Sequence, residues 1–344
     1  MFASEFAQLF QAVQAADRIM ITATEREDGD SIAAELAVRW IIQRTFPDSP
    51  KTVHVINERA CPKRYTFLPG AGEILALDRV EDTRYDVGIV VDCGADRSGR
   101  VKPIFDGCPF RVKIDHHAVS NSGNCSLEIV STDVAATTEL LFAFVDDPTW
   151  RMPLDPDLAE LIFVGILCDT GSFQYDLTRP STHRVAARLM ETGFDFPATA
   201  EKVYLARSYA MKKLLGLVLG EMERAPHGLY LWSVLTEDMM RRSGAAAEDT
   251  GDIIDELCFI HGVEVSMLFV EHPGESVRIS FRSRGGVHVG RFARRMSPTG
   301  GGHPRASGCV LPGRLETVIP AIREELDREL REAGLLPQGG DPKP

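Results

Sequence analysis

The tripeptide Asp115-His116-His117 carries the side chains best suited to chemistry in this chain. It follows an alternating apolar segment at residues 111–114, so a short strand would deliver one carboxylate and two imidazoles to its carboxyl end. A carboxylate beside imidazoles suits a divalent metal that accepts oxygen and nitrogen ligands, such as manganese or zinc. For this tripeptide alone, a polar turn after a strand is the alternative.

Three further acidic segments favour the metal interpretation. Asp28 and Asp30 flank a glycine, which lets the backbone turn so that both carboxylates can face one point. Asp92 ends a continuous apolar run, and Asp169 ends an apolar helical pattern, where the helix dipole disfavours a negative charge unless a cation offsets it. The alternatives are helix capping by Asp30 or Ser31 and a simple turn at Asp92.

Composition limits the class of protein. At 344 residues two domains are expected, and 44% hydrophobic with 26% charged residues is typical of a globular protein. A net charge of −12 argues against wrapping long duplex DNA, although a local basic pocket can still bind a short anionic substrate. Seven scattered cysteines fit a reducing cytoplasm. No basic N-terminal region or long apolar run indicates a signal peptide or a membrane span.

The hydrophobic patterns predict an α/β fold in two domains. In the first part, helices are expected at 2–16, 31–44, 133–145, 153–170 and 181–192, and strands at 18–22, 52–56, 85–92 and 111–114. After a connecting helix at 196–223, strands are expected at 229–235, 263–270 and 276–282, and helices at 249–260, after 287 and at 316–333. The expected boundaries are a metal-binding catalytic domain at 1–195, a connecting helix or linker at 196–224, a substrate-binding domain at 225–336 and a disordered tail at 337–344.

The four acidic segments, in this order and followed by Gly300-Gly301-Gly302-His303, resemble the DHH/DHHA1 phosphoesterase family. The resemblance covers about residues 15–335, and the short chain is most similar to the oligoribonuclease and pAp phosphatase members, where pAp is adenosine 3′,5′-bisphosphate. It implies an N-terminal DHH domain with a mainly parallel sheet flanked by helices, and a smaller C-terminal DHHA1 domain with a mixed sheet. The glycine-rich segment argues against the polyphosphatase and pyrophosphatase branch.

The resemblance also implies two manganese ions between the domains. The implied ligands are Asp28 and Asp92 for one ion, and Asp30, Asp92, His116 and Asp169 for the other. Asp92 would therefore bridge the ions, and Asp115 and His117 would support the site as further catalytic residues. Two cations about 3.5–4 Å apart can activate a water and neutralise phosphate oxygens.

One position departs from the family pattern. The first motif usually begins with a histidine four residues before the first aspartate, and here that position is Thr24. A hydroxyl is a weaker manganese ligand than an imidazole. The first metal site is therefore expected to be weakened and to need substrate for binding, unless Glu25, Glu27 or a water replaces the histidine.

The second domain is expected to hold the substrate. The candidate residues are Arg282, Ser283, Arg284, Gly301, Gly302, His303 and Arg305. Glycines let backbone N–H groups approach an anion, and arginine suits bidentate phosphate contacts. A flexible loop is the alternative for the glycines, and a solvated strand edge is the alternative for Arg282 and Arg284.

The predicted function is a cytoplasmic, manganese-dependent phosphodiesterase that degrades short RNA or dinucleotides to nucleoside 5′-monophosphates, with dephosphorylation of pAp as a further activity. Alternatives are hydrolysis of linear or cyclic dinucleotides such as pGpG or cyclic di-AMP, and a nucleotide-binding sensor that lost catalysis with Thr24. An exonuclease for long single-stranded DNA is disfavoured by length and net charge. The expected partners are the nucleotide substrate and, by resemblance, a second copy in a homodimer, but no membrane.

Overall fold

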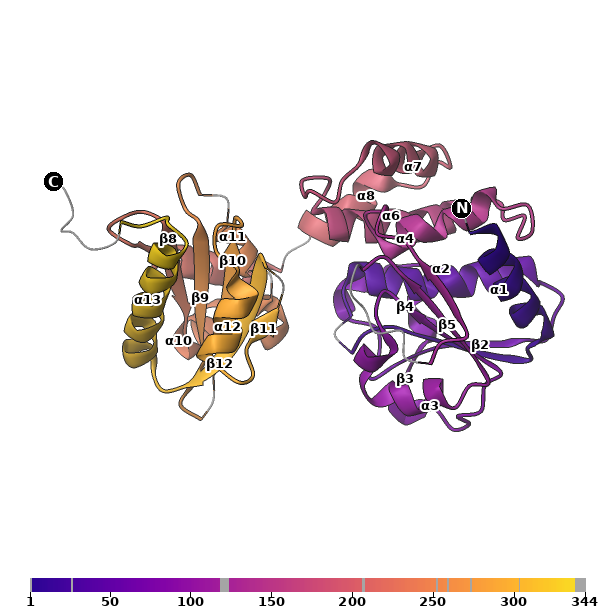
Figure 1. Cartoon of the computed structure of the whole chain (residues 1–344), viewed down its shortest axis with the longest axis horizontal. Coiled ribbons are helices and arrows are strands. Elements are labelled where there is room, and N and C mark those ends of the chain that lie inside the picture. Colours follow the sequence, from indigo (N-terminus) through magenta and orange to yellow (C-terminus); the bar gives the residue numbers. More distant parts are fainter. Residues whose placement is uncertain are drawn as a thin grey trace. The chain divides into compact units, whose positions relative to one another are not determined.

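The computed structural model of this chain contains two compact units, residues 1–206 and 207–344. It describes residues 2–25, 27–117, 124–205, 208–251, 253–258, 260–272, 274–302 and 304–337. His303 and the predicted tail from residue 338 onward therefore lie outside the described residues. Each unit has its own sheet (Figure 1). Each unit also has its own hydrophobic cores, two in the first and two in the second among the described residues.

The N-terminal unit is built on a six-stranded parallel sheet in the order β3-β2-β1-β4-β5-β6. The strands are β1 (Arg18–Thr22), β2 (Thr52–Asn57), β3 (Ile74–Ala76), β4 (Val87–Val91), β5 (Phe110–Asp115) and β6 (Leu127–Val130). The carboxyl ends of β1, β4 and β5 are adjacent at the point where the strand order reverses, which is where open α/β sheets bind ligands. The predicted parallel sheet is confirmed.

Helices cover both faces of this sheet. They are α1 (Ala3–Ala15), α2 (Gly29–Thr45), α3 (Lys102–Asp106), α4 (Thr137–Leu141), α5 (Ala143–Asp146), α6 (Pro156–Thr170), α7 (Pro180–Met190) and α8 (Phe196–Ala200), with short 3₁₀ helices at Lys63–Tyr65, Ala71–Glu73, Leu77–Arg79, Ala95–Arg97 and Gly99–Val101. One core joins α1, α2, α4, α5 and α6 to side chains such as Ile19 and Ile21. A smaller core joins α3 to Met20 and Val90 on the opposite face. Adjacent residues of β1 are thus buried on both faces, as is typical of a central parallel strand.

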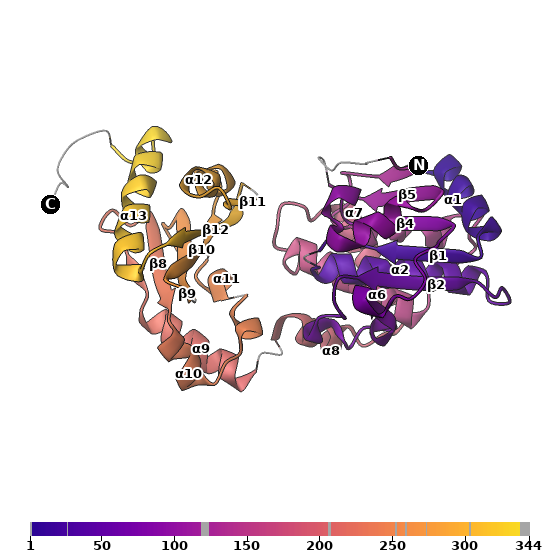
Figure 2. The ribbon, with the colours of Figure 1, turned by 90° about the horizontal axis from the view of Figure 1, so that it is seen from below.

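The C-terminal unit has a mixed six-stranded sheet in the order β11-β12-β10-β9-β8-β7, in which only the β8–β9 pair is parallel. The strands are β7 (Glu223–Arg224), β8 (Tyr230–Leu235), β9 (Val265–His272), β10 (Ser276–Ser283), β11 (Gly301–Gly302) and β12 (Ala306–Pro312), and the helices are α9 (Tyr209–Gly220), α10 (Glu237–Ser243), α11 (Ile253–Glu256), α12 (Val289–Met296) and α13 (Leu315–Glu332), with a 3₁₀ helix at Ala247–Thr250. Figure 2 shows α12 and α13 on one face and α9 and α10 on the other, in agreement with the two cores of this unit. The predicted smaller α/β domain with a mixed sheet is confirmed.

Several predicted elements differ from the structure. The connecting helix expected at 196–223 is divided into α8, a π-helix at Glu201–Leu205 and α9. The segment predicted as a helix at 133–145 contains the short helices α4 and α5 instead. The edge strands β3 and β6, with three and four residues, are too short for alternation to reveal them. None of the helices in the described part of the chain combines the length and hydrophobicity needed to cross a bilayer.

An aromatic cluster attaches α1 to the rest of the N-terminal unit. The rings of Phe6 and Phe144 stack with centroids 4.0 Å apart, and Trp150 lies edge-on to Phe144 at 5.1 Å. The indole nitrogen of Trp150 also donates a hydrogen bond to the backbone oxygen of Phe6 at 3.2 Å. Burial of these rings therefore supplies both hydrophobic free energy and a fixed orientation for α1.

We expect Phe144→Ala to lower the free energy of unfolding of the N-terminal unit by about 3–5 kcal/mol, because it leaves a cavity beside Trp150. Urea unfolding followed by tryptophan fluorescence measures this change. Tyr209→Ala is the control, since that side chain is 82% exposed and its loss is expected to change stability by at most about 0.5 kcal/mol. Equal effects of the two substitutions would contradict the structural role of the cluster.

Candidate metal centre

The predicted acidic segments all lie at one edge of the N-terminal unit. Asp28 and Asp30 begin α2 after β1, Asp92 follows β4 directly, and Asp115 ends β5. His116 and His117 continue from β5, and Asp169 is the penultimate residue of α6. Because the carboxyl ends of β1, β4 and β5 are neighbours, the fold brings residues distant in sequence to one place.

Four of these residues form what we call the metal-site cluster. Each of Asp30, Asp92, His116 and Asp169 offers one ligand atom within 4.8 Å of the others. Nε2 of His116 lies 3.0 Å from Oδ2 of Asp169 and 3.6 Å from Oδ1 of Asp92. This nitrogen is buried, and its polar neighbours are carboxylate oxygens that a cation could share with it. Three carboxylates and one imidazole suit a divalent cation such as manganese or zinc, so the cluster fits a metal.

Asp30 is held by the start of α4. Its Oδ2 accepts a hydrogen bond from the backbone N–H of Thr137 at 2.6 Å, and its Oδ1 accepts two from the N–H and hydroxyl of Thr138 at 3.0 and 2.7 Å. Asp30 is fully buried, and these donors stabilise its charged form. Sequence reasoning missed both threonines because they lie more than a hundred residues from Asp30 in the chain.

Asp92 is held in an unusual backbone conformation. Its φ of +59° lies in the left-handed region, which aspartate tolerates better than most side chains. This turn places Oδ2 of Asp92 2.7 Å from the hydroxyl of Ser31 and Oδ1 2.9 Å from the hydroxyl of Thr137, and both hydroxyls donate. Local strain of this kind is commonly stored at functional sites.

The cluster concentrates negative charge away from water. Burial, reinforced by the charge of Asp30, raises the pKa of Asp92 and of Asp169. Burial lowers the pKa of His116, but its contact with Asp169 and the charge of Asp30 outweigh this and raise the pKa to about 9. Without a cation, the folded protein must therefore retain protons here that an isolated carboxyl group would release. A bound divalent cation would remove that requirement.

Asp28 and Thr24 are not members of the metal-site cluster. Asp28 is exposed, and its Oδ1 accepts a hydrogen bond from the backbone N–H of Ser31 at 3.0 Å, so this aspartate caps α2. The capping alternative therefore holds for Asp28 rather than for Asp30 or Ser31. Thr24 is buried, and its hydroxyl has no hydrogen-bond partner within the described residues.

Asp115 and His117 form a second layer beside the cluster. Oδ1 of Asp115 lies 2.7 Å from Nδ1 of His117 and accepts a further bond from its backbone N–H at 3.1 Å. A carboxylate partner at Nδ1 keeps the proton on that nitrogen and leaves Nε2 available. Oδ2 of Asp115 lies 3.7 Å from Nζ of Lys113, a lysine only 2% exposed that sequence reasoning did not identify.

Two glycines allow the helices to bring these residues together. A Cβ on Gly29 would lie 2.1 Å from Sγ of Cys168, so only glycine lets the start of α2 approach the end of α6. A Cβ on Gly165 would lie 2.1 Å from the Thr138 hydroxyl and 2.2 Å from Oδ1 of Asp30. A glycine inside an otherwise apolar helix was the available sequence signal for Gly165.

The candidate substrate residues lie in the C-terminal unit. Arg282 and Ser283 end β10; Nε of Arg282 donates to Asp255 at 2.8 Å, and the Ser283 hydroxyl donates to the backbone oxygen of Val287 at 2.7 Å. Arg284 directly follows β10, and Arg305 directly precedes β12. Both residues are exposed. The backbone N–H of Ser283 donates to the backbone oxygen of Arg305 at 2.9 Å, which joins the two segments.

The glycine-rich segment is a strand rather than a flexible loop. Gly301 and Gly302 form β11, paired with Gly308 and Ser307 of β12. A Cβ on Gly302 would lie 2.5 Å from the backbone oxygen of Ala306, and its φ of +138° also favours glycine. Gly302 therefore satisfies a packing requirement, whereas a Cβ on Gly301 would approach other atoms only to 3.5 Å.

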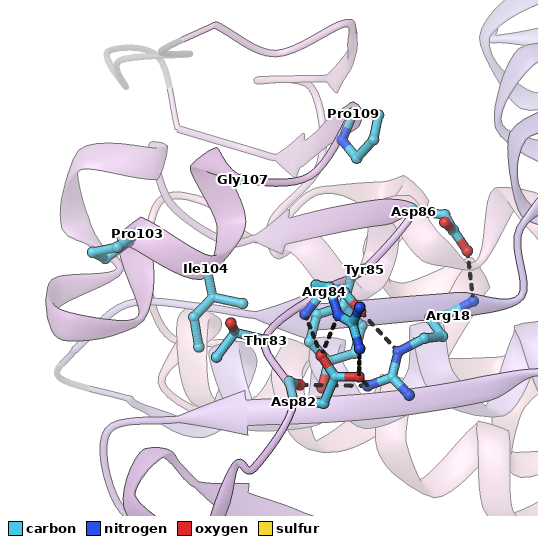
Figure 3. A pocket seen from close by; sticks show the side chains of 10 residues that line it. All are labelled: Arg18, Asp82, Thr83, Arg84, Tyr85, Asp86, Pro103, Ile104, Gly107 and Pro109. Atoms are coloured by element: carbon cyan, nitrogen blue, oxygen red, sulfur yellow. Dashed lines mark hydrogen bonds and ion pairs between the residues drawn. The ribbon is translucent and has the colours of Figure 1, made fainter.

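A separate pocket lies at the opposite edge of the N-terminal sheet. It has a volume of about 780 Å³ and is lined by residues at the amino ends of β1, β4 and β5 (Figure 3). The charged groups that line it are paired: Arg84 contacts Asp82 at 3.0 Å, and Asp86 accepts from the backbone N–H of Arg18 at 2.9 Å. The candidate metal ligands do not line this cavity.

Comparison with known families decides what kind of protein carries this centre. The sequence profile named "DHH family, N-terminal domain" matches residues 18–166, and the profile named "DHHA1 domain" matches residues 231–332. This chain is a member of the DHH/DHHA1 family. The predicted family is therefore confirmed. All four residues of the metal-site cluster lie in the N-terminal unit, with Asp169 three residues beyond the segment that the DHH profile matches.

Related proteins share most of the DHH/DHHA1 chain. The bifunctional oligoribonuclease and PAP phosphatase NrnA of Thermus thermophilus is 29% identical over 313 residues, which span 88% of each chain. The protein of the same name from Bacillus subtilis is 25% identical over 88% of this chain and 92% of its own. The crystal structure of an exopolyphosphatase-related protein from Bacteroides fragilis matches with a TM-score of 0.87 at 24% identity, over 96% of this chain and 98% of that one, and supports the fold.

Helix α2 carries another buried acid, Glu35, in addition to Asp30. Glu35 is fully buried; its Oε2 accepts a hydrogen bond from Asn57 at 2.9 Å, and its Oε1 has no hydrogen-bond partner within the described residues. Burial raises the pKa of Glu35 well above its ordinary value of 4.5. Ionising this carboxyl therefore costs folding free energy.

We expect Gly165→Ala to weaken manganese binding by about 10- to 100-fold, because the added methyl group would displace the Asp30 carboxylate. Isothermal titration of the metal-free protein with Mn²⁺ measures the affinity. Gly216→Ala is the matched control, since Gly216 also lies within a helix but a Cβ there meets nothing within 4 Å. Unchanged affinity in Gly165→Ala would show that Asp30 does not bind the ion.

We expect Glu35→Gln to stabilise the protein at pH 8 and to have little effect at pH 4. The pKa of Glu35 is higher in the folded than in the unfolded chain, so its unfavourable contribution exists only above about pH 4.5 and grows as the pH rises toward the folded pKa. Urea unfolding at the two pH values tests this. The control is Glu160→Gln, at a half-buried glutamate that accepts from the Thr199 hydroxyl. An equal change at both pH values would be incompatible with the buried-acid explanation.

Proposed function

We propose that this chain is a manganese-dependent phosphodiesterase of the cytoplasm that degrades short oligoribonucleotides and dinucleotides to nucleoside 5′-monophosphates and removes the 3′-phosphate of pAp. The observation that carries the proposal is the metal-site cluster of three carboxylates and one imidazole in a DHH/DHHA1 chain. The similarity to two proteins named as bifunctional oligoribonuclease and PAP phosphatase gives the substrate class. We further propose that the protein acts as a homodimer.

Each group of residues would have a separate task. The metal-site cluster would hold a divalent cation. Such a cation neutralises phosphate oxygens and lowers the pKa of a water molecule bound to it. Asp115 fixes the Nδ1 proton of His117, so Nε2 of that histidine is free to exchange a proton with the leaving group.

The C-terminal unit would hold the substrate phosphates. The proposed binding residues are Arg282, Ser283, Arg284, Gly301, Gly302, His303 and Arg305. Arg282 contacts Asp255 in the structure, so phosphate binding would replace that carboxylate with another anion of suitable geometry. With a net charge of −12 on the chain, attraction is limited to this local group of arginines, which favours short substrates.

A specific observation favours a second candidate, a nucleotide-binding sensor with weakened catalysis. The Thr24 hydroxyl is buried and has no hydrogen-bond partner among the described residues, at the position where the family usually has a metal-binding histidine. Such a protein would still bind nucleotides through the C-terminal unit. Turnover and binding must therefore be measured separately.

The test is hydrolysis of 5′-labelled RNA of two to five nucleotides, beside pAp, pGpG and cyclic di-AMP, with and without Mn²⁺. We expect Mn²⁺-dependent release of monophosphates, and loss of turnover by about 10³-fold in Asp92→Asn. Asparagine is chosen because it tolerates the left-handed backbone of Asp92, so the fold is expected to survive. Asp86→Asn, at the opposite end of the same strand, is the matched control and is expected to keep its activity.

The outcomes separate the candidates. Near-normal activity of Asp92→Asn would refute the metal-site assignment. Binding of these nucleotides without hydrolysis of any would favour the sensor. A strong preference for pGpG or cyclic di-AMP would identify the dinucleotide alternative, because the chemistry is shared and only the substrate differs.

A further inference from the structure

The donors for the two expected cations are unequally distributed. Asp30, Asp92, His116 and Asp169 provide one complete set of four donors. For the second ion, the family pattern leaves Asp28, a share of Asp92 and the position of Thr24, which offers a hydroxyl in place of an imidazole. His117 also lies within ligand distance of Asp92 and His116, but its Nδ1 is engaged by Asp115. A neutral hydroxyl binds Mn²⁺ weakly, so the second set has two good donors rather than three.

The structure also weakens Asp28 as a ligand. Its side chain is exposed to water, and its Oδ1 caps α2 by accepting from Ser31. An exposed carboxylate attracts a cation through high-dielectric solvent, where the interaction is small compared with that inside the buried metal-site cluster. Thr24, by contrast, is only 7% exposed, and its Oγ1 lacks a hydrogen-bond partner within the described structure. A buried polar atom without a partner is costly, and a ligand atom placed beside it would remove that cost.

Charge counting leads to the same conclusion. The metal-site cluster carries three carboxylates and an imidazole, so one divalent cation neutralises most of its charge. A second divalent cation would then be repelled by the first, with an interaction about four times that between two unit charges at the same distance. One negative charge of the cluster remains after the first cation binds, and this charge together with the water-exposed carboxylate of Asp28 offsets the repulsion only in part. A phosphate group adds negative charge and oxygen ligands at the same time.

We infer that the resting protein holds one divalent cation, at Asp30, Asp92, His116 and Asp169, and that the second cation binds only together with a phosphate group of the nucleotide. The inference deepens the proposed function and rests on it for the choice of nucleotide. The phosphate oxygens supply what Thr24 does not. Thermodynamic linkage then requires that the nucleotide and the second cation raise each other's affinity by the same factor.

The test counts bound ions without any turnover. The metal-free protein is titrated with Mn²⁺, and free Mn²⁺ is measured by electron paramagnetic resonance, with and without adenosine 5′-monophosphate. We expect one tightly bound ion in the protein alone, and a second that binds at least about tenfold more tightly when the nucleotide is present. Asp169→Asn is expected to lose the tight ion, because it removes a donor of the complete set.

Substitutions at Thr24 test the cause. Thr24→His is expected to bind two ions tightly without nucleotide, because it restores the missing imidazole. Thr24→Val, which keeps the shape but removes the hydroxyl, is expected to behave as the wild type does. Circular dichroism checks that each variant is folded, and the comparison of wild type with and without nucleotide does not depend on any variant.

Two tight ions in the wild type without nucleotide would overturn the inference, and so would a folded Thr24→His protein that still binds one. Failure of the nucleotide to raise Mn²⁺ affinity would overturn the role of phosphate. Ion counts that agree with the inference, in a protein that hydrolyses none of the substrates, would instead refute only the proposed phosphodiesterase activity. The two failures are therefore distinguishable.

Discussion

The buried carboxylates of the metal-site cluster repel one another, and the surrounding structure of the N-terminal unit must offset this repulsion. Asp30, Asp92 and Asp169 are brought within ligand distance of one another where water is largely excluded. Such a group is unfavourable unless it is protonated, hydrogen-bonded or bound to a cation. Thr137 and Thr138 donate hydrogen bonds that stabilise the carboxylate of Asp30. A bound metal ion would neutralise the negative charge that remains in the cluster.

Close packing and backbone strain hold the carboxylates against this repulsion. Gly165 lets α6 lie directly against the Asp30 carboxylate, and the left-handed turn at Asp92 directs its oxygens toward two hydroxyl donors. Neither feature would be favourable on its own. Both are consistent with a site whose geometry is determined before any ligand arrives, which is what metal and phosphate chemistry require.

Much of this fold and site could be predicted from sequence, because the signals were local. Buried parallel strands read as apolar runs, and an acid at the end of such a run lies at the carboxyl edge of the sheet, which placed Asp92 and Asp115 correctly. The threonine contacts to Asp30 could not be predicted, since they depend on how α4 packs against α2. The break in the connecting helix and the pairing of β11 with β12 were missed because no local pattern distinguishes them from a longer helix and a loop.

The contact between Cys168 and Gly29 bears on metal selectivity. This thiol neighbours Asp169 in the chain, and a thiolate there would attract soft, thiophilic ions. Burial, reinforced by the negative charges of Asp28 and Asp169, raises the pKa of the Cys168 thiol, so in the metal-free protein the sulfur carries its proton. The centre therefore presents oxygen donors and one imidazole, a set that disfavours copper(I) and cadmium and leaves the harder divalent ions as its natural occupants.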